Sequence, residues 1–132
     1  MTPDRRRRLI GWVPAIAWLS MIFVLSSQPS LPSPPSVSDK EAHAFTFGVL
    51  AVLLLMGLTA WRWRTVTRSA LLAAFLLAVA YGVSDEVHQR FVPGRTPDVA
   101  DVVADAVGAA LAMGAAGAWA ILLDRRRTAA RP

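Results

Sequence analysis

The sequence contains no cysteine, which excludes disulfide bonds and thiolate metal sites and leaves two histidines as soft ligands. It also contains no nucleophilic serine motif, no HExxH zinc motif, no phosphate-binding loop and no dinucleotide-binding glycine motif. Charged residues make up only 17% of the chain, against 55% hydrophobic residues. The net charge of +5 comes from arginines in short runs beside apolar segments, a placement typical of membrane orientation signals rather than of nucleic-acid binding.

Most of the hydrophobic residues are grouped in long apolar segments instead of being scattered along the chain. A length of 132 residues leaves no room for a second domain, so we predict a single domain over residues 1–132. The predicted fold is all-α, an integral membrane four-helix bundle surrounded by membrane lipids. A cleaved signal peptide is the alternative for the first segment, although Leu25 and Ser27 form a poor cleavage site. The four spans are predicted at about residues 9–27, 40–61, 67–89 and 98–123.

Local signals predict where the helices begin and end. A proline-rich stretch, residues 29–35, favours an extended loop after the first span. Ser38 and Glu41 have the spacing of a capping box at the start of the second span. Gly94 can supply the positive φ of a turn after the third span, and Thr96–Pro97 are predicted to cap and open the last helix.

The basic residues are distributed unevenly between the two ends of these spans. Four precede the first span, three lie between the second and third, and four follow the last. Only Lys40, Arg90 and Arg95 lie at the other end, where most of the acidic residues gather. Because basic loops stay in the cytoplasm, both termini are predicted there, with the polar motifs facing outward.

Three aspartates form a stripe at the start of the last span. Asp98, Asp101 and Asp105 are spaced i, i+3 and i+7, which places them on one face of a helix. Asp98 can satisfy the free amides of the first turn, but Asp105 lies about two turns inside an apolar helix. A carboxylate at that depth needs a partner, water or a proton, so we interpret Asp101 and Asp105 as functional or essential pairing residues.

Polar residues from the other spans are predicted to converge on this stripe. The acid and base candidates are Glu86, Asp101 and His43, and Arg95 can clamp a phosphate or carboxylate in two-pronged geometry. Paired acids can also hold a hard cation, but no residue is assigned as a metal ligand and the cofactor is left open. The predicted ligand-binding residues are Gln28, Lys40, His43, Asp85, Glu86, Gln89, Arg95, Asp98, Asp101 and Asp105.

Small residues recur along the last span. Gly108 pairs with Ala112, and Ala110 with Gly114, at the spacing that lets membrane helices approach closely. We predict that these pairs serve packing within the chain. A homo-oligomer formed through this helix is the alternative.

Several motifs occur in a fixed order along the chain: Ser26-Ser27-Gln28-Pro29, Asp39-Lys40 with His43, Ser84-Asp85-Glu86 with Gln89, Phe91 to Arg95, Asp98, Asp101 and Gly108. In this order they resemble the VanZ-like family of bacterial membrane proteins, whose first member was named for its association with teicoplanin resistance. The resemblance covers most of the chain and differs from the family pattern at two positions. Phe47 stands where a tyrosine is common, which removes a hydroxyl, and Asp105 stands where an asparagine is common, which makes the outer pocket more negative.

The resemblance implies a multi-pass protein of the bacterial cytoplasmic membrane, part of the cell envelope. Our leading hypothesis is that its outward polar pocket binds a lipid headgroup or a lipid-linked cell-wall component and affects glycopeptide susceptibility. The alternatives are an enzyme acting on a lipid-linked or phosphate-bearing substrate, a small ion-coupled transporter that uses Asp101 and Asp105, and a polar network that only locks the helices together.

Overall fold

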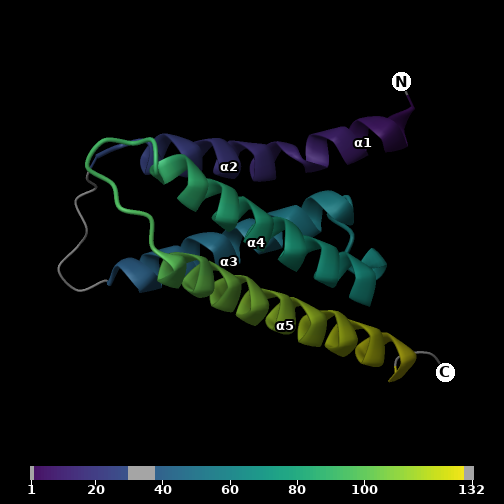
Figure 1. Cartoon of the computed structure of the whole chain (residues 1–132). Coiled ribbons are helices and arrows are strands. Elements are labelled where there is room, and N and C mark those ends of the chain that lie inside the picture. The colour runs from purple at the N-terminus through teal and green to yellow at the C-terminus, as the bar shows by residue number, and fades with distance from the viewer. Residues whose placement is uncertain (1, 30–37, 130–132) are drawn as a thin grey trace.

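The computed structural model describes residues 2–29 and 38–129 and contains four helices long and apolar enough to cross a membrane (Figure 1). No strand occurs in these described ranges, so the prediction of an all-α fold with four spans is confirmed. Most of the proline-rich stretch predicted as a loop lies outside the described residues. In chain order the helices are α1 (Pro3–Gly11), α2 (Val13–Ser26), α3 (Asp39–Leu58), the short 3-10 helix η1 (Trp63–Thr65), α4 (Arg68–Gln89) and α5 (Val99–Ala129).

The first predicted span is present from Asp4 to Ser26, with a break of one residue in its helix. Trp12 separates α1 from α2. Its amide donates a hydrogen bond to the Leu9 carbonyl, three residues back instead of the four of a regular α-helix. Pro14 is the physical reason, because proline has no amide hydrogen to offer the Ile10 carbonyl one turn earlier. The chain therefore bends where α2 begins.

The other helix ends also differ in detail from the prediction. Helix α3 ends at Leu58 instead of near residue 61, because Ala60 and Trp61 adopt positive φ angles of 49° and 62°. The last helix begins at Val99, not at Thr96–Pro97, and continues to Ala129 beyond the predicted end at 123. The predicted capping box at Ser38 and the positive φ of Gly94, at 83°, are both confirmed.

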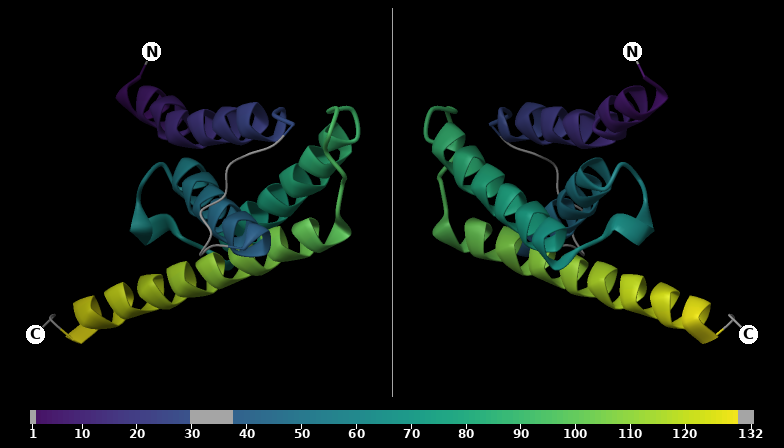
Figure 2. Two further views of the ribbon diagram at one scale, coloured as in Figure 1. Left: turned by 90° about the vertical axis from the view of Figure 1, so that its left-hand side faces the viewer. Right: turned by 90° about the vertical axis from the view of Figure 1, so that its right-hand side faces the viewer.

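Helix α3 packs across α5 (Figure 2). This contact sets the position of the start of α3 relative to the start of α5. A Cβ atom at Gly108 would lie only 1.9 Å from the Ala44 carbonyl oxygen, so the two backbones meet where no side chain fits. The prediction that Gly108 serves packing within the chain is confirmed. A Cβ atom at Gly114 would meet no atom within 4 Å, so the predicted packing within the chain does not extend to this residue, and the alternative of self-association there is untested.

Two side-chain hydrogen bonds join α2 to the other helices, in addition to its buried residues Ala15 and Ile22. Trp18 Nε1 donates to the Thr46 carbonyl at 3.0 Å, and Tyr81 Oη donates to the Leu19 carbonyl at 2.7 Å. Large apolar side chains are exposed on the outside of several helices, among them Leu111 at 70%. In water that surface would be unfavourable, whereas lipid is its natural solvent.

Candidate functional site

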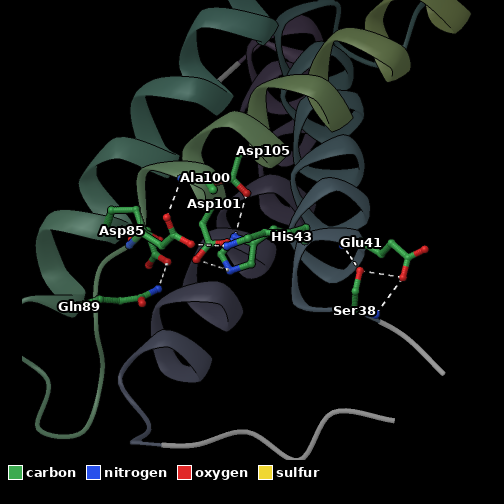
Figure 3. A network of polar contacts seen from close by, with 11 residues as sticks. Ser38, Glu41, His43, Asp85, Gln89, Ala100, Asp101 and Asp105 are labelled. Atoms are coloured by element: carbon green, nitrogen blue, oxygen red, sulfur yellow. Dashed lines mark hydrogen bonds and ion pairs between the residues drawn. The ribbon is translucent and has the colours of Figure 1, made fainter. Parts of the chain in front are cut away.

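The start of α3, the end of α4 and the start of α5 bring their polar side chains together at one end of the bundle (Figure 3). Asp85, Glu86 and Gln89 of α4 are buried at 5%, 7% and 4% exposure. Asp101 and Asp105 of α5 are buried as well. Buried carboxylates are stable only when they are paired or hydrogen-bonded, so their partners define what this site can do.

His43 lies between the two buried aspartates of α5. Its Nδ1 is 3.0 Å from Asp105 Oδ1, and its Nε2 is 3.9 Å from Asp101 Oδ2 (Figure 3). Asp105 is only 1% exposed, and a Cβ atom at Gly82 would lie 2.6 Å from Asp105 Oδ2. The glycine therefore leaves room for the carboxylate, and the imidazole is its one hydrogen-bond partner among the described residues. The predicted need of Asp105 for a partner is met by His43.

Lys40 joins the two outer aspartates of the stripe. Its ammonium donates to Asp98 Oδ2 at 2.6 Å and also to Asp101 Oδ1. The ammonium beside it holds the pKa of the Asp98 carboxyl below its ordinary value, and the Ala100 amide, 2.9 Å from Asp98 Oδ1, acts in the same direction. Asp98 is thus the capping residue of α5, a role that the sequence analysis also gave to Thr96.

Glu86 connects the end of α4 to the start of α5. Its Oε2 accepts the Asp98 amide at 2.8 Å, while Oε1 is buried without a partner in the described structure. Beside it Gln89 Nε2 donates to Asp85 Oδ2 at 3.1 Å. One oxygen of Glu86 is therefore structural, and the other is free to accept a hydrogen bond.

A cavity of about 160 Å³ opens among these residues. Arg95 reaches it from the loop after α4, and its buried Nε has no partner in the described residues. Gln28, predicted to bind ligand, is exposed and does not line the cavity. The lining residues are Ile22, Leu25, Ser26, Asp39, Ala42, His43, Thr46, Phe47, Asp85, Gln89 and Arg95.

Asp39 is a site residue that the sequence analysis did not select. One ligand atom from each of Asp39, His43 and Asp101 lies within 4.8 Å of the others, a set able to hold a metal ion. The signal was present, because Asp39 and His43 are four residues apart and share one face of α3. Ser26 and Thr46 also line the cavity; Ser26 belongs to the motif that ends the first span, whereas no sequence signal marked Thr46.

Phe47 lines the cavity beside His43. Its ring is stacked on His43 at a centroid distance of 6.3 Å and is tilted against Tyr81 at the same distance. The side chain is 1% exposed, so it closes the apolar floor beneath the imidazole. Phe47 has no hydroxyl to offer His43, so among the described residues the polar contacts of the imidazole are those with Asp101 and Asp105.

The comparisons with known proteins agree with the motifs at this site. The sequence pattern of the VanZ/LLP1 family matches residues 11–122, which include every cavity residue. No curated protein and no solved structure gives a match. The match covers four apolar helices and most of the chain. The protein is therefore a multi-pass membrane protein that belongs to the VanZ/LLP1 family.

Proposed function

We propose that the polar cavity faces outward from the bacterial cytoplasmic membrane and binds the headgroup of a lipid or of a lipid-linked cell-wall component. The arginine-rich segments at the opposite end of the spans support this orientation, with both termini in the cytoplasm. If the ligand is a cell-wall precursor or a lipid beside such a precursor, this binding would change the susceptibility of the cell to glycopeptides such as teicoplanin.

The observation that carries this proposal is the mixed lining of the cavity. Ile22 and Leu25 of α2 form an apolar wall, and Arg95 faces the same space with a buried Nε that lacks a partner in the described structure. Arginine pairs well with phosphate and carboxylate groups, and the apolar wall suits the first carbons of a lipid chain.

The carboxylates in the cavity lining restrict which ligands can bind. Asp39 and Asp85 line the cavity together with Arg95, so carboxylates outnumber the guanidinium. A simple dianion would be repelled by them, whereas a headgroup that carries both an anionic group and an amine or hydroxyl groups would match both. We therefore expect the ligand to be zwitterionic or rich in hydroxyl groups.

The test compares two neighbouring arginines. Lipids that copurify with the full chain in mild detergent would be identified by mass spectrometry for wild type, Arg95→Gln and Arg90→Gln. Arg90 is exposed and does not line the cavity, so it controls for the loss of one charge at this end. We expect Arg95→Gln to lose a bound lipid that Arg90→Gln retains. Equal retention in all three proteins would contradict the proposal.

A susceptibility assay extends this test to the cell. In a deletion background, wild type, Arg95→Ala and Asp101→Asn would be produced at matched membrane abundance and exposed to teicoplanin. A wild-type effect that both variants lose would place the function in the cavity and the polar network beside it, since Arg95 lines the cavity and Asp101 contacts Lys40 and His43. Unchanged susceptibility in every strain would remove the teicoplanin part of the proposal and leave the lipid-binding test as the deciding result.

A membrane enzyme is the second candidate, favoured by the position of His43 between two carboxylates. The 3.0 Å contact with Asp105 orients the ring, and Nε2 faces Asp101, an arrangement suited to proton transfer. In that reading Arg95 holds a phosphate, and Glu86 or Asp101 acts as acid or base on a lipid-linked substrate. Turnover of a polyprenyl phosphate or phospholipid that disappears in Glu86→Gln would favour the enzyme; binding without turnover would favour the headgroup-binding function.

A further inference from the structure

A second cavity, of about 700 Å³, lies at the opposite end of the molecule, where α1 meets α2. Its lining contains Arg6 and Arg7 of α1 and Trp61 from the loop after α3. Figure 1 shows this region at the end of the bundle that also carries the end of α5, far from the loops beside the polar cavity. We call it the arginine groove.

The bend at Trp12 and the turn after α3 build this groove together. Trp61 Nε1 donates to the Gly11 carbonyl at 3.0 Å, which attaches the indole to the end of α1. Ala60 and Trp61 both have positive φ, so the backbone turns the ring toward α1 instead of continuing α3. The Trp61 ring is 3.3 Å from the position of a Cβ at Gly11, so a side chain there would press against the indole.

The two arginines of the groove have no acidic partner among the described residues. The one acid near them in sequence, Asp4, forms an ion pair with Arg62 at 3.6 Å, and both arginines are exposed. The wall below them is apolar: Ile10 is 54% exposed, and Pro14 lies one turn further along. The groove therefore presents positive charge at its rim and apolar surface at its side.

We propose that the arginine groove binds one anionic phospholipid, with the phosphate at Arg6 and Arg7 and an acyl chain along Ile10 and Pro14. Guanidinium groups match a phosphate in geometry as well as charge, and an indole favours the headgroup layer. A free anion would leave the apolar wall uncovered, and a zwitterionic lipid would gain less from two cations. The proposal does not depend on the function of the polar cavity.

Native mass spectrometry of the full chain in detergent micelles tests the stoichiometry and selectivity. The chain would be titrated with phosphatidylglycerol, with phosphatidylcholine of the same acyl chains, and with inorganic phosphate. We expect a one-to-one adduct with phosphatidylglycerol at concentrations where the other two form none. Equal binding of phosphatidylcholine, or displacement of the lipid by equimolar inorganic phosphate, would overturn the proposal.

Matched charge variants separate the groove from the general attraction of a basic surface. Arg6→Gln with Arg7→Gln removes two charges from the groove, and Arg125→Gln with Arg126→Gln removes two charges from exposed positions near the end of α5. Only the groove variant is expected to weaken phosphatidylglycerol binding, by about tenfold or more. Equal weakening by both variants would show diffuse electrostatic attraction and would refute the site.

Tryptophan fluorescence provides a readout of position that does not depend on affinity. Phosphatidylglycerol with brominated acyl chains quenches an indole that it touches. Wild type should be quenched more than Trp61→Phe at saturating lipid, because Trp61 is 48% exposed on the groove wall. Identical fractional quenching of the two proteins would place the lipid elsewhere, even if the adduct forms.

Discussion

The pairing of His43 with Asp105 gives the sharpest prediction for the candidate site. Replacing His43 by alanine leaves a carboxylate that is 1% exposed without its hydrogen-bond partner at 3.0 Å. Breaking a buried pair from one side costs about 3–5 kcal/mol. This cost has an upper limit, because the carboxyl can take up a proton instead of remaining charged. Protonation costs about 1.4 kcal/mol of free energy for each unit by which the pH exceeds an ordinary pKa of about 3.9. At pH 7 this limit is about 4 kcal/mol.

We therefore expect His43→Ala to lower the free energy of unfolding by about 3–4 kcal/mol at pH 7. The loss should shrink as the pH falls toward 5, because the neutral carboxyl becomes cheaper to form in the variant. The assay is unfolding of the purified full chain, in which mixed micelles are titrated with sodium dodecyl sulfate and helicity is followed by circular dichroism.

A double variant tests the cause of this loss. Asp105→Asn removes the charge but keeps a carbonyl oxygen for the imidazole, so alone it should cost about 1 kcal/mol. In His43→Ala with Asp105→Asn no buried charge is left unpaired, and we expect the double variant to recover about 2 kcal/mol relative to His43→Ala. His88→Ala is the matched control. His88 contacts the exposed Ser27 hydroxyl at 3.0 Å, and its loss should cost about 1 kcal/mol or less.

Two results would refute this reasoning. If His43→Ala unfolds within 1 kcal/mol of His88→Ala, the buried carboxylate does not depend on the imidazole. If the double variant is as unstable as His43→Ala at pH 7, the loss comes from missing packing around the ring rather than from an unpaired charge.

Three further predictions concern residues that hold the helices around the site in place. Gly108→Val should destabilise the chain by about 3 kcal/mol or more in the same unfolding assay, because its Cβ would lie 1.9 Å from the Ala44 carbonyl oxygen, whereas Gly114→Ala should be neutral or slightly stabilising. Ser38→Ala should cost about 1 kcal/mol by removing the capping box of α3, and an unchanged unfolding curve would contradict this. The pKa of Asp98 is lowered by its paired ammonium, so its contribution to stability is present above the ordinary value and is lost as pH falls through the lowered one. Asp98→Asn should therefore flatten the acid limb of a stability–pH profile, and equal slopes in both proteins would count against the pairing.

The sequence was sufficient for the features that depend on spacing along one helix. The stripe of aspartates on α5, the capping box at Ser38 and the turn at Gly94 all follow from local rules. Spacing also indicated that Asp105 needs a partner, since an acid two turns inside a span is costly alone.

Features that depend on contacts between helices could not be predicted from spacing. Nothing local shows that Gly108 faces Ala44, and that contact is what brings His43 to Asp105. Gln28 belongs to a family motif and yet is exposed outside the cavity, so its predicted role in ligand binding stays a prediction. Pro14 was the sequence signal for the break at Trp12. The prediction did not use it, because the apolar run around it is long enough for a single span.

The division of the site between α3 and α5 has a consequence for biosynthesis. Lys40 is 61 residues from Asp101 and His43 is 62 residues from Asp105, so each pair joins an early span to the last one. A chain that is still being inserted has its imidazole and ammonium in place before any of their aspartate partners on α5 has been synthesised. The site is therefore assembled only when the final helix enters the membrane, and a product truncated before α5 carries Lys40 and His43 without their aspartate partners on that helix.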